Sequence, residues 1–262
     1  GLKRSNQANI VIVSVTLIAL ITLVVLGAPP ALDGFSQQLQ LWQPSANNDG
    51  VAKSFMRATA LMFVAYTGYG RIATLGEEIK NPRRNIPRAM ITTLSIIGIL
   101  YALVSWVAVG VLGADNLGNA AKSSAAPLQK IGEALGAEWL STLIVIGAIT
   151  AMLGVLLNLL LGLSRVALAM ARRNDLPSGL ARVNENNGSP TRAVLFVGII
   201  IAGLSCLGSV ETTWSFSAFT VLIYYSLTNA AALQLSAEER LFPRWISYAG
   251  LLSCLSLAFW VE

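Results

Sequence analysis

The chain alternates between long apolar runs and short polar connections, and this pattern predicts its elements. A helix needs about 20 apolar residues to cross the hydrocarbon core of a bilayer. Seven runs meet that length, with approximate cores at 9–27, 54–79, 89–113, 139–169, 193–208, 214–234 and 245–261. The pattern therefore predicts an all-α membrane protein: a polytopic bundle of seven transmembrane helices forming a single transmembrane domain over residues 1–262.

Two of the predicted outer connections are long and differ in character. The 28–53 connection contains Pro29 and Pro30 and is expected to be polar and irregular. The 114–138 connection contains APLQKIGEALG, whose apolar spacing suits a short interfacial helix.

Charge supports the membrane assignment and sets an orientation. Charged residues make up 12% of the chain, whereas an ordinary soluble domain has about 25%. Cytoplasmic loops of membrane proteins carry an excess of Lys and Arg. With a cytoplasmic N-terminus, thirteen of the 18 Lys and Arg residues lie inside, Arg71 lies in a span, and four lie outside. Those four are Lys53, Arg57, Lys122 and Lys130. We therefore expect a multi-pass protein of the cell membrane with the N-terminus of this sequence in the cytoplasm.

One stretch departs from the composition of a regular membrane helix. Residues 63–87 read FVAYTGYGRIATLGEEIKNPRRNIP, and Gly68 and Gly70 lie near the centre of the second run. Each mid-helix Gly costs about 1 kcal/mol relative to Ala. A Gly-x-Gly at this depth predicts two half-helices around an unwound joint, where secondary transporters bind polar solutes. Alternatively, Gly68 lies on a packing face that lets a neighbouring helix approach.

An interruption there would create a site for a charged solute from the main chain itself. The first half-helix would expose carbonyls of residues 64–67 at its negative end, and the second would expose amides from Tyr69 onward at its positive end. A zwitterion matches both ends, because its ammonium takes carbonyls and its carboxylate takes amides.

Other polar positions inside the runs are candidates for lining a pathway. Arg71 follows the joint, where a cation is costly unless paired or hydrated. Three roles are open for this side chain. It could line an inner vestibule, extend to the membrane interface by snorkelling, or pair with a structural carboxylate of another helix. The fourth run carries a small and polar stripe within about a third of the helix circumference. Its members are Gly147, Thr150, Gly154, Asn158, Gly162 and Arg165. Such a stripe packs against a helix or lines a hydrated path, for which Asn158 and Thr150 are the candidates.

The sequence gives little support to covalent chemistry. There is no histidine, which removes the commonest proton shuttle and metal ligand. It contains no His-Glu-x-x-His, Cys-x-x-Cys or Gly-x-Ser-x-Gly motif, and the Gly-x-Gly lacks the third Gly of a nucleotide-binding turn. We therefore expect no enzyme, no catalytic residue, no metal site and no cofactor. The expected partners are the lipid bilayer and a small solute, without nucleic acid.

The stretch 63–87 resembles the sixth transmembrane helix of the amino acid-polyamine-organocation (APC) superfamily. Its cationic-amino-acid-transporter-like permeases carry Phe-x-Ala-Tyr-x-Gly-aromatic, then Glu-Glu, Asn-Pro and a further Pro. The matching residues here are Phe63, Ala65, Tyr66, Gly68, Tyr69, Glu77, Glu78, Asn81, Pro82 and Pro87. In addition, SRVALAMARRNDLP at 164–177 is similar to the end of the eighth helix, and SPTRA at 189–193 to the entry of the ninth.

The resemblance implies a fold and a function. The seven runs would correspond to family helices five to eleven, a C-terminal fragment, and helices six to ten would form one half of a five-helix inverted-repeat transporter fold. It implies a broken helix at 63–79 and transport of amino acids by alternating access. Carried over by position, the carbonyls of Val64, Ala65 and Thr67 would bind the substrate ammonium, with Tyr69 as an aromatic gate beside Gly68 and Gly70.

Two departures from the family pattern leave the coupling open. Many relatives have an acidic residue where this sequence has Gly70, and proton-coupled members often have a Lys where it has Thr16. Coupling to a proton, coupling to sodium and uncoupled exchange all stay open. The alternative function is a non-transporting amino acid sensor, or the membrane subunit of a complex.

Overall fold

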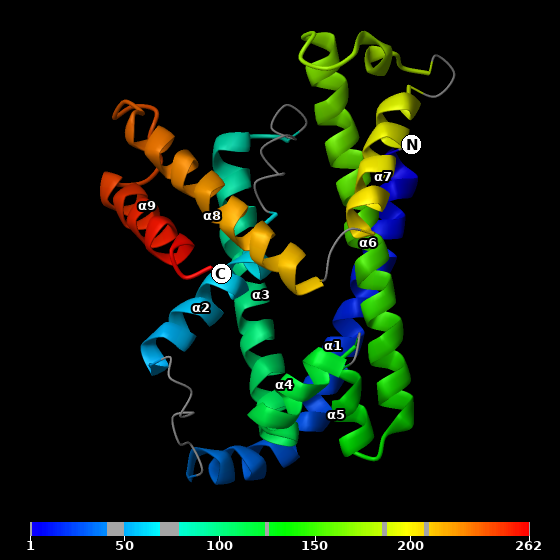
Figure 1. Ribbon diagram of the computed structural model, residues 1–262, viewed down its shortest axis with the longest axis vertical. Helices are drawn as coiled ribbons and strands as arrows, with labels where there is room; N and C mark the ends of the chain where they lie inside the picture. Colours follow the sequence, from blue (N-terminus) through cyan, green and yellow to red (C-terminus); the bar gives the residue numbers. More distant parts are fainter. Residues whose placement is uncertain are drawn as a thin grey trace. The chain divides into compact units, whose positions relative to one another are not determined.

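The computed structural model describes residues 2–40, 50–68, 79–123, 126–184, 188–206 and 210–261, and the regular structure in these ranges is helical. The chain divides into two compact units (Figure 1). The first comprises Gly1–Trp42 and Ser95–Leu204, and the second comprises Gln43–Leu94 and Ser205–Glu262. Each unit is described by itself.

The first unit is built around two long helices that lie side by side, α1 (Leu2–Gln40) and α6 (Glu138–Arg172) (Figure 1). They run antiparallel, because Gly154 of α6 meets Ile12 and Gly147 meets Ala19. The shorter helices are α4 (Ala114–Ser123), α5 (Gln129–Ala134), the 3-10 helix η3 (Ser178–Ala181) and α7 (Thr191–Ser205). The expected helix of the 114–138 connection is therefore present as α5, preceded by α4, which we did not predict.

The core of the first unit joins α1, α5 and α6 to α3 (Pro82–Leu112). Its buried members are Leu23, Ala31, Val107, Ala108, Ile131, Leu140 and Ile144. Small residues let the backbones approach here: a Cβ on Gly34 would overlap the carbonyl oxygen of Gly110. Close contact of this kind is a main source of helix association in lipid, where the hydrophobic effect between helices is absent.

The expectation of an irregular chain after residue 27 is wrong for residues 28–40, where α1 continues as a helix through Pro29 and Pro30. Each proline removes one N–H donor from the helix, but its fixed φ is compatible with the α conformation. Packing compensates for those two lost bonds, since Ala31 is fully buried against this core and Gly34 lies on Gly110. The segment after the prolines turns away from the direction of the rest of α1 (Figure 1), as proline kinks do.

The second unit contains α2 (Val51–Phe63), the 3-10 helix η1 (Val64–Tyr66), α8 (Val210–Leu233) and α9 (Arg244–Ala258). The helices α8 and α9 pack side by side as a hairpin (Figure 1). A Cβ on Gly250 would come within 2.5 Å of the Asn229 Oδ1, so the glycine allows this close approach. The buried cluster of the unit comprises Ala60, Leu222, Cys254 and Ala258.

The loop between α8 and α9 is held by hydrogen bonds at its polar residues. Glu239 Oε2 accepts from the Ser236 amide at 3.0 Å and from its hydroxyl at 2.8 Å. The Ser236 hydroxyl and amide lower the pKa of the exposed Glu239 carboxyl. This bonding therefore stabilises the loop at neutral pH and is lost as pH falls through the lowered pKa. Arg83 Nη2 donates to the Glu238 carbonyl at 2.6 Å, which ties the start of α3 to the same loop.

Four described helices are long and apolar enough to span a membrane: Asn9–Gly34, Pro82–Leu112, Glu138–Arg172 and Thr212–Leu233. They coincide with the first, third, fourth and sixth predicted runs, and the shorter Thr191–Ser205 coincides with the fifth. The remaining two runs contain the shorter helices α2 and α9. An all-helical membrane bundle is thus supported, whereas the count of seven spans and the inverted repeat stay predictions.

The contact at Gly110 yields a stability prediction. In Gly110→Ala the new Cβ would lie 2.8 Å from both the Cα and the carbonyl oxygen of Ala31. Backbone atoms cannot move aside cheaply, so we expect a loss of about 1 to 3 kcal/mol, typical of overpacking. Thermal unfolding of the full-length protein in detergent should show a lower apparent Tm. The matched control is Gly203→Ala, where no neighbour lies within 4 Å. An unchanged Tm for Gly110→Ala would contradict the close contact.

Candidate functional site

The helix α2 stops inside the second apolar run. Its α-helical part ends at Phe63, one turn of 3-10 helix follows to Tyr66, and Thr67 is extended with φ −90° and ψ 175°. Gly68 has φ +99°, a conformation that L side chains rarely adopt. Regular helix therefore ends at the position where the Gly-x-Gly pattern predicts an interruption. Tyr69, Gly70 and Arg71 lie outside the described residues, as does any second half-helix at 69–78.

Local hydrogen bonds account for this ending. The Thr67 amide donates to the Val64 carbonyl at 3.1 Å, and the Thr67 hydroxyl donates to the same oxygen at 2.7 Å. The 3-10 turn tightens the helix end, and a glycine with positive φ commonly follows such an end. The Val64 carbonyl oxygen thus accepts two bonds from one residue. Of the three carbonyls predicted to bind an ammonium, that of Val64 is therefore already occupied by two donors.

The side of the site formed by α8 was not predicted from the sequence. Trp214 Nε1 donates to the Leu61 carbonyl at 3.0 Å, two residues before α2 ends. The Phe63 and Tyr225 rings meet edge to face with centroids 5.7 Å apart. The signal in the sequence was ambiguous, because a Trp in the first turn of an apolar run is usually an interfacial anchor.

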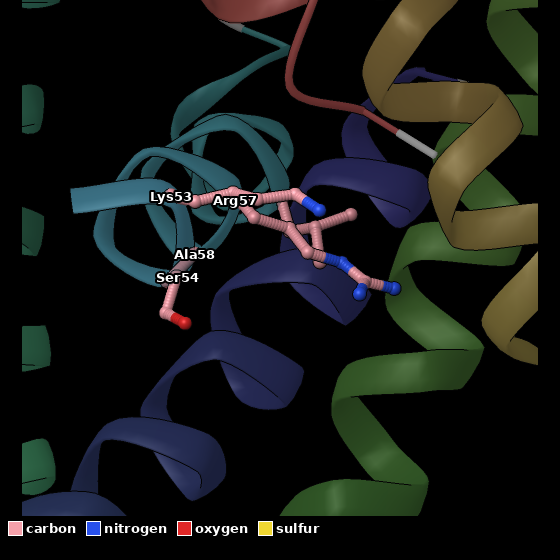
Figure 2. Close-up of a pocket in the computed structure, with 5 residues that line it drawn as sticks. Lys53, Ser54, Arg57 and Ala58 are labelled. Atoms are coloured by element: carbon pink, nitrogen blue, oxygen red, sulfur yellow. The ribbon is translucent and has the colours of Figure 1, made fainter. Parts of the chain in front are cut away.

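The N-terminal half of α2 presents two cations on one side. Lys53, Ser54, Arg57, Ala58 and Leu61 line a hollow along this helix. Figure 2 shows the side chains of Lys53 and Arg57 extending to the same side of α2. Lys53 and Arg57 are among the four cations that the sequence analysis predicts to lie outside the cell. Leu61, which also lines the hollow, carries the carbonyl that accepts the hydrogen bond from Trp214.

The stripe on α6 meets α1. A Cβ on Gly147 or Gly154 would lie within 2.8 Å of α1 side chains, and Asn158 Nδ2 donates to Asn9 Oδ1 at 3.0 Å. Thr150 donates to the carbonyls of Ile146 and Gly147 in its own helix at 2.9 and 3.0 Å. These contacts favour the packing interpretation of the stripe, while a pathway role for Thr150 and Asn158 stays a prediction. Both belong to the first unit, whereas residues 64–68 belong to the second.

A metal site has no support within the described ranges. There, His, Cys, Asp and Glu side chains nowhere gather in groups of three that could hold an ion. The groups that the candidate site offers are main-chain dipoles, aromatic rings and the two cations of α2.

Comparison with known proteins decides the family. The family model described as "Amino acid permease" matches residues 1–261. The chain belongs to the amino acid permease family. The resemblance found in residues 63–87 and 164–193 is therefore confirmed at the level of the family.

The sequence is similar over most of its length to three transporters or permeases of bacteria and plants. It is 39% identical to an uncharacterized transporter of Mycobacterium tuberculosis, over 99% of this chain and 57% of that protein. It is 27% identical to the branched-chain amino acid permease BcaP of Bacillus subtilis, over 93% of this chain and 50% of the relative. It is 28% identical to the vacuolar cationic amino acid transporter 4 of Arabidopsis thaliana, over 85% of this chain and 38% of the relative.

The names of the family and of these relatives point to transporters rather than enzymes. The apolar helices of this permease make it a multi-pass membrane protein. The chain spans about half the length of the relatives it matches, and their names point to different substrates.

The bond between Asn158 and Asn9 separates the two interpretations of the α6 stripe. If Asn158 serves packing, a double-mutant cycle with Asn9→Ala and Asn158→Ala should give a coupling of about 0.6 kcal/mol, the average for polar pairs between membrane helices. Equilibrium unfolding in mixed micelles measures it. Zero coupling, together with loss of solute uptake in Asn158→Ala alone, would contradict packing and favour a hydrated path.

Proposed function

We propose that this chain forms the ammonium-binding side of the substrate site in a secondary active transporter of amino acids. The substrate ammonium binds the carbonyls of Ala65 and Thr67, with a weaker contribution from Val64. Its carboxylate binds amides from Tyr69 and Gly70, and Tyr69 closes over the solute. Rocking of the helix bundle then exposes the site to each side of the membrane in turn.

The observation that carries the proposal is the end of helix at residues 64–68 inside an apolar run. A helix C-terminus bears a partial negative charge of about half an elementary unit. That charge is screened little in a bilayer, so it attracts a cationic group. The exposed carbonyls also need partners, since each unsatisfied main-chain group costs several kcal/mol there. A bound ammonium supplies both a charge and hydrogen-bond donors.

The predicted pathway and coupling complete the proposal. Arg71 lines the inner vestibule just past the joint. Thr150 and Asn158 are the candidates for lining a path along α6, although their contacts favour packing. Coupling to a proton, coupling to sodium and uncoupled exchange are all compatible with the proposal. A neutral amino acid is the preferred substrate class, because the residues proposed for the site carry no acidic side chain that would bind a cationic one.

Uptake into vesicles tests the transport function directly. We expect the full-length protein, reconstituted in liposomes, to take up at least one of the twenty labelled L-amino acids with saturable kinetics. Unlabelled amino acids lacking the α-ammonium, supplied as N-acetyl derivatives, should not compete. Measurable binding without uptake or exchange would contradict transport and favour a sensor. Equal competition by the N-acetyl derivatives would contradict ammonium recognition by the carbonyls.

The joint itself is tested by Gly68→Leu. A Leu at φ +99° is strained, and such strain costs about 1 to 3 kcal/mol, so the chain near residue 68 should leave its observed conformation. We expect substrate affinity to fall about tenfold or more, while membrane insertion and yield stay normal. Scintillation proximity binding measures the affinity. The matched control is Gly203→Leu on α7, where an added Cβ meets no neighbour within 4 Å, and it should bind as the wild type does. Unchanged affinity in Gly68→Leu would return Gly68 to a packing role.

A further inference from the structure

The last turn of α2 is held by a donor from another helix. Trp214 lies in the first turns of α8, and its indole Nε1–H donates to the Leu61 carbonyl at 3.0 Å. The two residues are 153 positions apart in the chain. An indole N–H is a donor only, so the bond places this helix end relative to α8.

This bond lies where the helix most needs an external partner. The last four carbonyls of any α-helix lack the regular amide partner four residues on. Leu61 is one of these four, since α2 ends at Phe63. In water such a carbonyl would be hydrated, but in an apolar run it must find a donor from protein. Trp214 supplies that donor at the point where the backbone turns into η1.

A second contact from α8 fixes the same helix end further along. The Tyr225 ring meets the Phe63 ring at 5.7 Å with an interplanar angle of 80°, a favourable edge-to-face geometry. Leu222, which is fully buried, belongs to the cluster that contains Ala60 of α2. Trp214, Leu222 and Tyr225 fall within roughly a quarter of the circumference of α8. One face of α8 thus holds α2 from Ala60 to Phe63, immediately before the interruption.

We infer that Trp214 is a positioning residue for the substrate site: its bond to the Leu61 carbonyl holds the end of α2, and thereby the carbonyls of Ala65 and Thr67, in place for the ammonium. This inference rests on the proposed function. Trp214 itself lies outside the site and acts through Leu61, which precedes the proposed ligand Ala65 by four residues. Its loss therefore weakens substrate binding without removing any ligand group.

The test compares a variant that loses the donor with one that keeps it. Trp214→Phe keeps an aromatic ring and removes the N–H, whereas Trp214→His keeps a ring N–H. With a labelled L-amino acid that the wild-type protein takes up, we expect Trp214→Phe to raise the KM of uptake about three- to tenfold, the loss of one hydrogen bond. The kcat should stay within about twofold, and Trp214→His should recover part of the KM. Trp245→Phe is the control, because Trp245 at the start of α9 is 67% exposed.

Hydrogen exchange supplies a readout that does not depend on the substrate. In the full-length protein in nanodiscs, amides of residues 62–68 should exchange faster in Trp214→Phe than in Trp245→Phe. An unchanged KM, or unchanged exchange in this segment, overturns the inference. A fall in kcat with KM unchanged also overturns it, because that pattern indicates a general structural defect. If the wild-type protein neither binds nor takes up any amino acid, the proposed function is overturned instead, whatever the exchange data show.

Discussion

The constraint on which the second unit depends is the need of main-chain polar groups for partners where water is absent. Regular helix satisfies that need internally, and it ends at Phe63. Around this point the described groups find partners by other means: Trp214 donates to Leu61 just before the helix ends, and Thr67 donates twice to Val64 just after it. Because the Val64 carbonyl is occupied in this way, the proposal assigns the ammonium to the carbonyls of Ala65 and Thr67. The proposed recognition of an ammonium follows from this division.

The two units use different means of holding helices together. In the first, glycines let helices approach until backbone meets backbone, as at Gly34 and Gly110, and a single amide pair joins Asn158 to Asn9. In the second, aromatic side chains of α8 reach the end of α2, while Gly250 lets α8 and α9 approach. Backbone contact between small residues leaves little room for adjustment. Here the aromatic contacts lie at the end of α2, and a single 3-10 turn and an extended Thr67 follow.

Much of the fold follows from the sequence because apolar run length is a direct physical requirement of the bilayer. The end of regular helix just before Gly68 was also predictable, since glycine favours a backbone conformation that L side chains rarely adopt. The continuation of α1 through Pro29 and Pro30 was not predictable, because local breakers argue against it and the compensating contacts come from α3. The role of Trp214 was missed for a similar reason: its partner is 153 residues away and is a carbonyl, which no side-chain pattern reveals. The sequence likewise does not reveal that the Val64 carbonyl accepts hydrogen bonds from both the amide and the hydroxyl of Thr67.

The central claim is that the chain leaves the helical conformation after Tyr66, at Thr67 and Gly68, while it is inside the membrane. Solid-state NMR of the full-length protein in lipid bilayers, with labelled Ala, Thr and Gly, measures it most directly through the carbon chemical shifts of Ala65, Thr67 and Gly68. The account predicts extended shifts for Thr67, non-helical shifts for Gly68 and helical shifts for Ala60 in the same spectrum. Helical shifts at all four residues would contradict it.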